Sequence, residues 1–122
     1  MTASPTPPNA PPEGGWRVHV LCAEWCGVCR DYRPFVQEQS RRGEAEWVWV
    51  DIETHSDRLG ELDIDNFPTL LITQGGAPRF LGPVTPQPEV AERLLLSLRA
   101  GNRYALPEVQ DLPGIVRALS AL

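Results

Sequence analysis

Two cysteines separated by two residues, Cys26 and Cys29, lie between an apolar run and a stretch with helical periodicity. This spacing brings both thiols to one turn at the start of a helix. There the two sulfurs can form a small disulfide, or one can face solvent with the other behind it. Free backbone N–H groups and the helix dipole favour negative charge at this end, which stabilises a nucleophilic thiolate. The junction between the apolar run and the helix is therefore where chemistry is expected.

Alternating apolar residues predict that 16–22 form a strand, in the centre of a sheet. Its two faces are Val18, Val20 and Cys22 on one side and Arg17, His19 and Leu21 on the other. The following helix is predicted over 26–42, with Gly43 just past its end and a kink at the internal Pro34. Residues 46–52 are apolar on both faces, as in a strand that helices cover.

The second half of the chain continues this alternation. A short helix capped by Thr54 or Ser56 carries Leu59 and Leu62, and strands follow at 67–73 and 79–81 around a turn at 74–77.

Two further helices are expected. Thr85-Pro86 predicts the start of one, with Val90, Leu94 and Leu98 as its buried stripe and Gly101 after its end. The last helix is expected over 112–121, with Ile115, Val116, Leu119 and Leu122 on one face.

Charge and composition exclude several classes of protein. Eleven basic and sixteen acidic residues give a net charge of −5, which disfavours binding to nucleic acid or an anionic membrane. The run 94–98 is far shorter than the roughly 20 residues that cross a bilayer. The first residues lack the pattern of a secretory signal, so a cytoplasmic location is expected. The protein is also expected to be a monomer. Residues 1–15 are interpreted as a disordered proline-rich tail and 16–122 as one domain.

The combination of Trp25-Cys26-Gly27-Val28-Cys29, Pro34 and Phe67-Pro68-Thr69 resembles the thioredoxin family, over about residues 16–100. The resemblance implies an α/β fold: a mixed sheet of about four strands with helices on both faces. The segment before Trp16 is too short for the family's first strand and helix, and a helix is added at the far end. We therefore expect an N-terminally trimmed thioredoxin-like fold whose C-terminal helix covers exposed sheet or the flank of the domain.

The same resemblance assigns roles to the residues of the motif. Cys26 becomes the thiol that attacks a substrate disulfide, and Cys29 the buried thiol that resolves the mixed disulfide. The proline at the position of Pro68 is cis in the family and faces the cysteine pair. No metal or cofactor is expected, and the partners would be protein disulfides and an electron donor. The substrate groove and its support would comprise Trp25, Gly27, Val28, Phe67 and Pro68.

This chain departs from the family pattern at three positions. The family's buried Asp is Val20 here, and the Lys that accompanies it corresponds to Trp49. The proton from Cys29 must therefore leave through water or Glu24, and resolution is expected to be slower near neutral pH. Replacing Val20 with Asp should then speed the reduction of a model disulfide. Val28 replaces the usual proline between the cysteines, which should shift the redox potential.

Other interpretations of the cysteines stay open at this point. The pair could be half of a zinc site completed by Cys22, His19 or His55. The spacing CxxxCxxC, which begins at Cys22, also occurs in radical S-adenosylmethionine enzymes, but these need a much larger barrel than 122 residues supply. A thioredoxin-fold interaction or redox-sensing module without general turnover is the alternative to an enzyme.

The remaining candidates have simpler interpretations. Cys22 is interpreted as a small buried strand residue, or otherwise as a third thiol that traps Cys26 or Cys29 in an off-pathway disulfide. His19 is expected at the surface or an edge, and His55 at a helix start. Trp47 and Trp49 are expected to pack in the core and at an edge.

Overall fold

The structure is a computed structural model that describes residues 15–60, 62 and 64–122. The tail predicted over residues 1–15 therefore lies outside the described residues, except for Gly15. The elements in chain order are β1 (Trp16–Cys22), α1 (Gly27–Arg42), β2 (Glu46–Asp51), the 3₁₀ turn η1 (Ser56–Arg58), β3 (Thr69–Gln74), β4 (Ala77–Pro83), α2 (Pro88–Arg99) and α3 (Leu112–Ser120).

The four strands form one mixed sheet in the order β2-β1-β3-β4. β1 runs parallel to β2 and antiparallel to β3, and β4 is antiparallel to β3. The prediction that β1 is central and that the sheet is mixed is therefore confirmed. The parallel pair β1 and β2 is joined by α1, which packs across the sheet as a crossover helix does.

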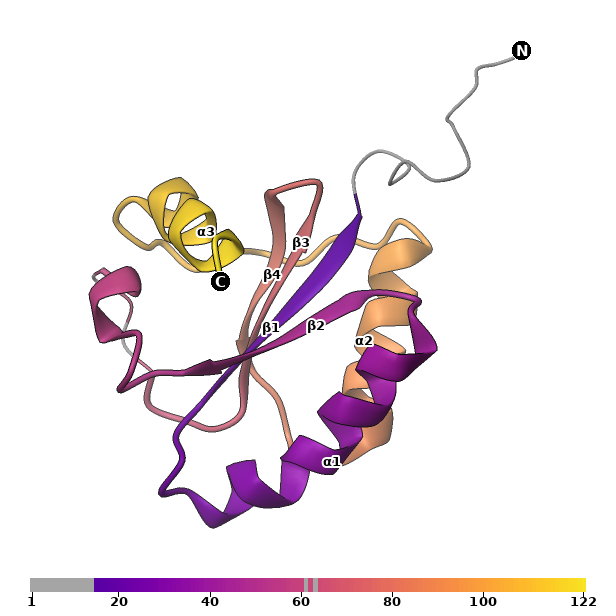
Figure 1. Ribbon diagram of the computed structural model, residues 1–122. Helices are drawn as coiled ribbons and strands as arrows, with labels where there is room; N and C mark the ends of the chain where they lie inside the picture. The colour runs from indigo at the N-terminus through magenta and orange to yellow at the C-terminus, as the bar shows by residue number, and fades with distance from the viewer. Residues whose placement is uncertain (1–14, 61, 63) are drawn as a thin grey trace.

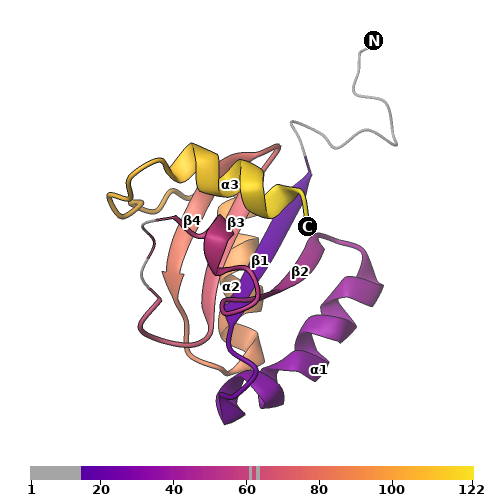
Figure 2. The ribbon, with the colours of Figure 1, turned by 60° about the vertical axis from the view of Figure 1, so that its left-hand side comes forward.

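Helices cover both faces of the sheet, as Figures 1 and 2 show. α1 and α2 lie against one face, where Val18, Val20 and Cys22 of β1 are fully buried. α3 and η1 lie against the other face, where Leu21 packs against Leu119 and its neighbours. The predicted alternation of β1 and the predicted cover by the C-terminal helix are both confirmed.

α3 is held to the sheet by polar contacts as well as by its apolar face. Asp111 precedes it in the left-handed conformation (φ 56°) and accepts a hydrogen bond from the Gly114 N–H at 3.2 Å. The guanidinium groups of Arg17 and Arg58 each donate to a carbonyl near its C-terminus, at 2.8 Å. These bonds satisfy carbonyls that the helix leaves free.

Two predicted helices differ in detail from the observed ones. Instead of a short helix after Thr54 there is only η1, which His55 precedes without any side-chain cap. α2 begins at Pro88 rather than at Pro86, with Gln87 before it. Its buried residues are Ala91, Leu95 and Leu98. The predicted stripe of Val90, Leu94 and Leu98 was therefore correct at Leu98 and one residue too early at its other two positions.

The prediction for His19 was wrong. This residue has no exposed surface, because β1 lies between two other strands and α3 covers that face. Its Nδ1 donates to the Leu71 carbonyl oxygen across the β1–β3 pair at 3.3 Å. Burial lowers the pKa of His19 to about 4, despite the opposing effect of that hydrogen bond. The imidazole is therefore neutral in the folded protein near pH 7.

Candidate active site

Cys26 occupies the position before the first residue of α1. Its backbone is extended (φ −88°, ψ 122°), its N–H donates to the Ala23 carbonyl at 3.1 Å, and its carbonyl accepts from the Arg30 N–H at 3.1 Å. The thiol is free and partly exposed. The first turn of α1 contains no acidic residue. As at any helix start, the first N–H groups lack partners within the helix, and the Cys26 side chain caps none of them.

The sulfur of Cys29 is bonded to that of Cys22, not to that of Cys26. Cys22 ends β1 and Cys29 lies in the first turn of α1, so the bond ties the helix start to the central strand across a Cα–Cα distance of 5.8 Å. Both residues have no exposed surface. Cys22 is thus buried as predicted and also forms the third-thiol disulfide that the sequence left as an alternative. The roles of Cys26 and Cys29 in exchange remain predictions.

An apolar surface lies beside Cys26. Trp25 is 61% exposed, and its ring meets the Phe67 ring edge-on with 5.6 Å between centroids. The Trp25 indole N–H donates to the Glu53 carboxylate at 3.0 Å, which fixes the ring. The Phe67–Pro68 peptide bond is cis. The structure therefore brings the two ends of the predicted groove, Trp25 and Phe67-Pro68, together from segments that are far apart in sequence.

Gly27 and Val28 complete the exposed side of the helix start. Val28 is 41% exposed and extends the apolar surface around Cys26. A Cβ on Gly27 would meet only the Arg30 guanidinium, at an ordinary contact distance of 3.7 Å. Gly27 therefore leaves the approach to Cys26 open without being sterically required.

The positions of the family's acid–base pair are neighbours here too. Val20 and Trp49 are paired in register between β1 and β2. Val20 is fully buried, and Trp49 packs against the same core while the Arg33 guanidinium lies 5.0 Å from its ring centroid. An Asp at position 20 would thus be buried opposite an indole. Whether Val20→Asp speeds reduction stays a prediction, and the variant should also lose stability.

Glu24, the other proposed proton acceptor, is engaged at the surface. Its carboxylate accepts from the Arg33 guanidinium at 3.1 Å, and its carbonyl accepts from Arg30 at 3.1 Å. These two arginines hold the loop before Cys26 against α1. In the structure Glu24 thus supports the shape of the site.

The zinc interpretation finds no support in the arrangement of the side chains. Within the described part of the chain, no three His, Cys, Asp or Glu residues are grouped so that they could hold a metal ion. Cys22 is bonded to Cys29, and the buried His19 donates to a backbone carbonyl.

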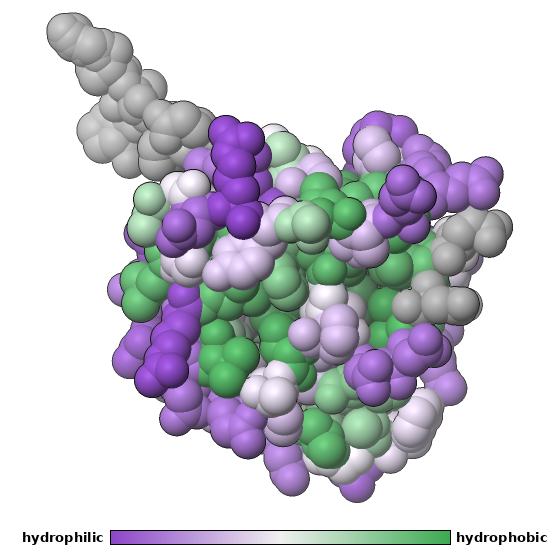
Figure 3. Space-filling model, turned by 180° about the vertical axis from the view of Figure 1, so that it is seen from behind, coloured by the Kyte–Doolittle hydropathy of each residue, from purple (hydrophilic) through white to green (hydrophobic). Residues whose placement is uncertain are grey.

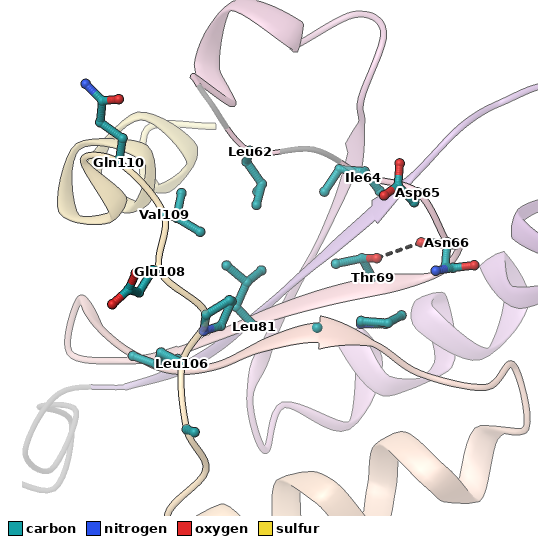
Figure 4. Close-up of a pocket in the computed structure, with 14 residues that line it drawn as sticks. Leu62, Ile64, Asp65, Asn66, Thr69, Leu81, Leu106, Glu108, Val109 and Gln110 are labelled. Carbon is teal, nitrogen blue, oxygen red and sulfur yellow. Dashed lines mark hydrogen bonds between the residues drawn. The ribbon is translucent and has the colours of Figure 1, made fainter.

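A cavity of about 740 Å³ lies away from the cysteines, between β4 and the segment before α3 (Figure 4). Apolar side chains line much of it, among them Leu62, Ile64, Leu81 and Val109. Figure 3 shows apolar groups gathered on the side of the molecule where β4 forms the sheet edge. None of the described residues that line this cavity is a cysteine.

The family model described as Thioredoxin matches residues 18–88, which include all three cysteines, Trp25 and Pro68. The chain belongs to the thioredoxin family. The thioredoxin of Listeria monocytogenes is 39% identical over 56 residues, which are 44% of this chain and 54% of that protein. This chain therefore matches about half the length of that relative.

More distant similarities agree with the family. A bifunctional thioredoxin reductase/thioredoxin of Mycobacterium leprae is 29% identical over 58 residues, covering 46% of this chain and 13% of that protein. Oxidised thioredoxin of Plasmodium falciparum superposes with a TM-score of 0.59 at 21% identity, over 70% of this chain and 82% of that one. Fasciola hepatica thioredoxin superposes with a TM-score of 0.59 at 20% identity, over 74% of this chain and 84% of that one. The thioredoxin-like fold, a mixed sheet of four strands with helices on both faces, is thereby confirmed.

One feature of the site is predicted only as an alternative, and another is not predicted at all. The sequence gives the bond of Cys22 to Cys29 only as an alternative to simple burial of Cys22, although it places Cys22 on the same strand face as Val18 and Val20. That face packs against α1. The hydrogen bond from Trp25 to Glu53 had no sequence signal, because the two residues are brought together only by the pairing of β1 with β2.

Proposed function

We propose that this protein is a thiol–disulfide oxidoreductase that exchanges disulfides with protein substrates through Cys26 and Cys29. The observation that carries the proposal is the free, partly exposed Cys26 at the N-terminus of α1, one turn before a cysteine that is already in a disulfide. Membership of the thioredoxin family supports the same chemistry.

The exchange begins when the Cys26 thiolate attacks one sulfur of a substrate disulfide. A mixed disulfide forms and the first substrate thiolate leaves. The Cys29 thiol then loses its proton and attacks Cys26 Sγ, which releases the second substrate thiolate. The dipole of α1 favours negative charge at its N-terminal end, where Cys26 attacks and later leaves.

The apolar surface around Cys26 would receive the substrate chain. Trp25, Val28 and Phe67 offer exposed or half-buried apolar area next to the sulfur, and the buried Pro68 follows Phe67. Such a surface binds unfolded or extended protein segments better than small polar disulfides. Protein disulfides are therefore the proposed substrate class.

The electron donor is proposed to be a reductase, because one relative is a thioredoxin fused to a thioredoxin reductase.

None of the helices within the described residues has the length and apolar character to cross a bilayer. We infer a monomeric protein, formed by residues 16–122 as one domain, that helps to maintain thiol balance in the cytoplasm.

Reduction of insulin disulfides by dithiothreitol tests the proposal. The wild-type protein should accelerate the reaction, and Cys26→Ser should reduce the rate to that of dithiothreitol alone. Ser56→Ala is a matched surface control at η1, remote in sequence from the cysteines. Equal rates for the wild type and Cys26→Ser would refute the proposal.

A redox-sensing module is the second candidate. The Cys22–Cys29 disulfide has no exposed surface, and apolar residues occupy the positions of the proton-handling pair, both of which favour slow turnover. A sensor would form the disulfide under oxidants yet give little acceleration in the insulin assay. Catalytic turnover well above the uncatalysed rate would favour the enzyme.

A further inference from the structure

The three cysteines form one connected group at the junction of β1 and α1. Cys29 is bonded to Cys22 on its strand side, and Cys26 lies three residues before it at the helix start. The Cys22–Cys29 pair is fully buried, whereas Cys26 is partly exposed. The Cα–Cα distance of 5.8 Å lies in the range usual for disulfides.

We propose that Cys22 is a second resolving thiol, which takes over the bond to Cys29 and frees Cys26. This inference rests on the proposed function, because a substrate disulfide supplies the oxidising equivalents. The oxidised protein then keeps its disulfide in the core while its attacking thiol is available again.

The sequence of exchanges balances. The Cys26 thiolate attacks the substrate disulfide, and Cys29 displaces the substrate to give a Cys26–Cys29 bond. Cys22 then loses its proton and attacks Cys29 Sγ, so that the Cys22–Cys29 bond forms, the Cys26–Cys29 bond breaks and Cys26 leaves as thiolate. The substrate gains two electrons, and its two sulfurs take up the protons lost by Cys29 and Cys22 through solvent.

Burial determines how the stored disulfide is reduced. A thiol from outside cannot reach Cys22 or Cys29, because neither has exposed surface. Cys26 must therefore attack Cys29 Sγ, which returns the bond to Cys26–Cys29 and exposes it at the helix start. The external dithiol then attacks Cys26. Cys26 is thus the only path for electrons into the core pair.

The sequence provides a sharp test by disulfide mapping. The reduced protein is oxidised with one equivalent of oxidised dithiothreitol or insulin, quenched in acid, unfolded and labelled with N-ethylmaleimide. Cleavage after glutamate separates Cys22, on a peptide ending at Glu24, from Cys26 and Cys29, which stay together. We expect two peptides joined through Cys22 and Cys29, with the label on Cys26. A bond within the second peptide, with the label on Cys22, would overturn the proposal.

Variants separate this inference from the proposed function. In Cys22→Ala the bond should lie between Cys26 and Cys29, with no label. In Cys26→Ser the Cys22–Cys29 bond, formed with diamide, should be reduced by dithiothreitol at least about tenfold more slowly than in the wild type, and unfolding in urea should abolish the difference. Equal rates would contradict the route through Cys26. If insulin reduction depends on Cys26 but the mapped disulfide joins Cys26 to Cys29, only this inference is refuted and the proposed function stands.

Discussion

A titratable imidazole without exposed surface lies in the middle of β1. His19 donates through Nδ1 to the Leu71 carbonyl, and its Nε2 has no hydrogen-bond partner within the described residues. Burial lowers its pKa from an ordinary value near 6.5 to about 4. The unfolded chain therefore takes up a proton first as the pH falls, so the free energy of unfolding should decrease between about pH 6.5 and pH 4. The full loss amounts to roughly 3 kcal/mol at 1.36 kcal/mol per pKa unit.

Urea unfolding at pH 7, 5.5 and 4 measures this loss. His19→Gln, which is neutral throughout, should flatten the part of the pH dependence due to His19, whereas His55→Gln should leave it in place. His55 is the other histidine of the chain and lies at the edge of η1. An unchanged slope in His19→Gln would show that other groups cause the acid sensitivity.

At the scale of the elements, α3 depends on its first turn. Asp111 accepts from the Gly114 N–H, and a Cβ at position 114 would collide with the Asp111 carboxylate. Asp111→Ala should therefore lower the free energy of unfolding by about 1 kcal/mol, since it removes the cap. Asp111→Asn should lose much less, because Asn both caps and tolerates a positive φ. Thermal unfolding of the two variants would distinguish them, and equal losses would mean that charge alone matters.

At the scale of the whole molecule, α3 closes the sheet face opposite α1 and α2. Leu119 is fully buried between α3 and the sheet, so Leu119→Ala should cost about 2–5 kcal/mol of unfolding free energy. Leu96→Ala, at a position of α2 that is 64% exposed, should change it by less than about 0.5 kcal/mol. Chemical denaturation compares the two. A Leu119→Ala variant as stable as Leu96→Ala would show that α3 is not part of the cooperative core.

Two local patterns predicted much of the fold from the sequence. The alternation of apolar residues marks β1, and the glycines with positive φ mark the ends of α1 and α2. The start of α2 could not be predicted from local signals: Thr85-Pro86 and Gln87-Pro88 both offer a proline for the first turn, and the helix begins at the second, although Gln is not a favoured N-cap residue. The burial of His19 and the bond of Cys22 to Cys29 depend on strand order and on how α1 lies across β1. Apart from the strand face of Cys22, these properties of the assembled sheet leave no local pattern in the sequence.

The central claim is that Cys26 is the sulfur that attacks substrate. A variant with Cys22→Ala and Cys29→Ser lacks both thiols that could resolve a mixed disulfide, so it should hold a substrate on Cys26. Mass spectrometry without reductant, after incubation with insulin, should show one covalently attached insulin molecule that dithiothreitol releases. Absence of this adduct, or an equal yield when Cys26→Ser is added to the variant, would contradict the account.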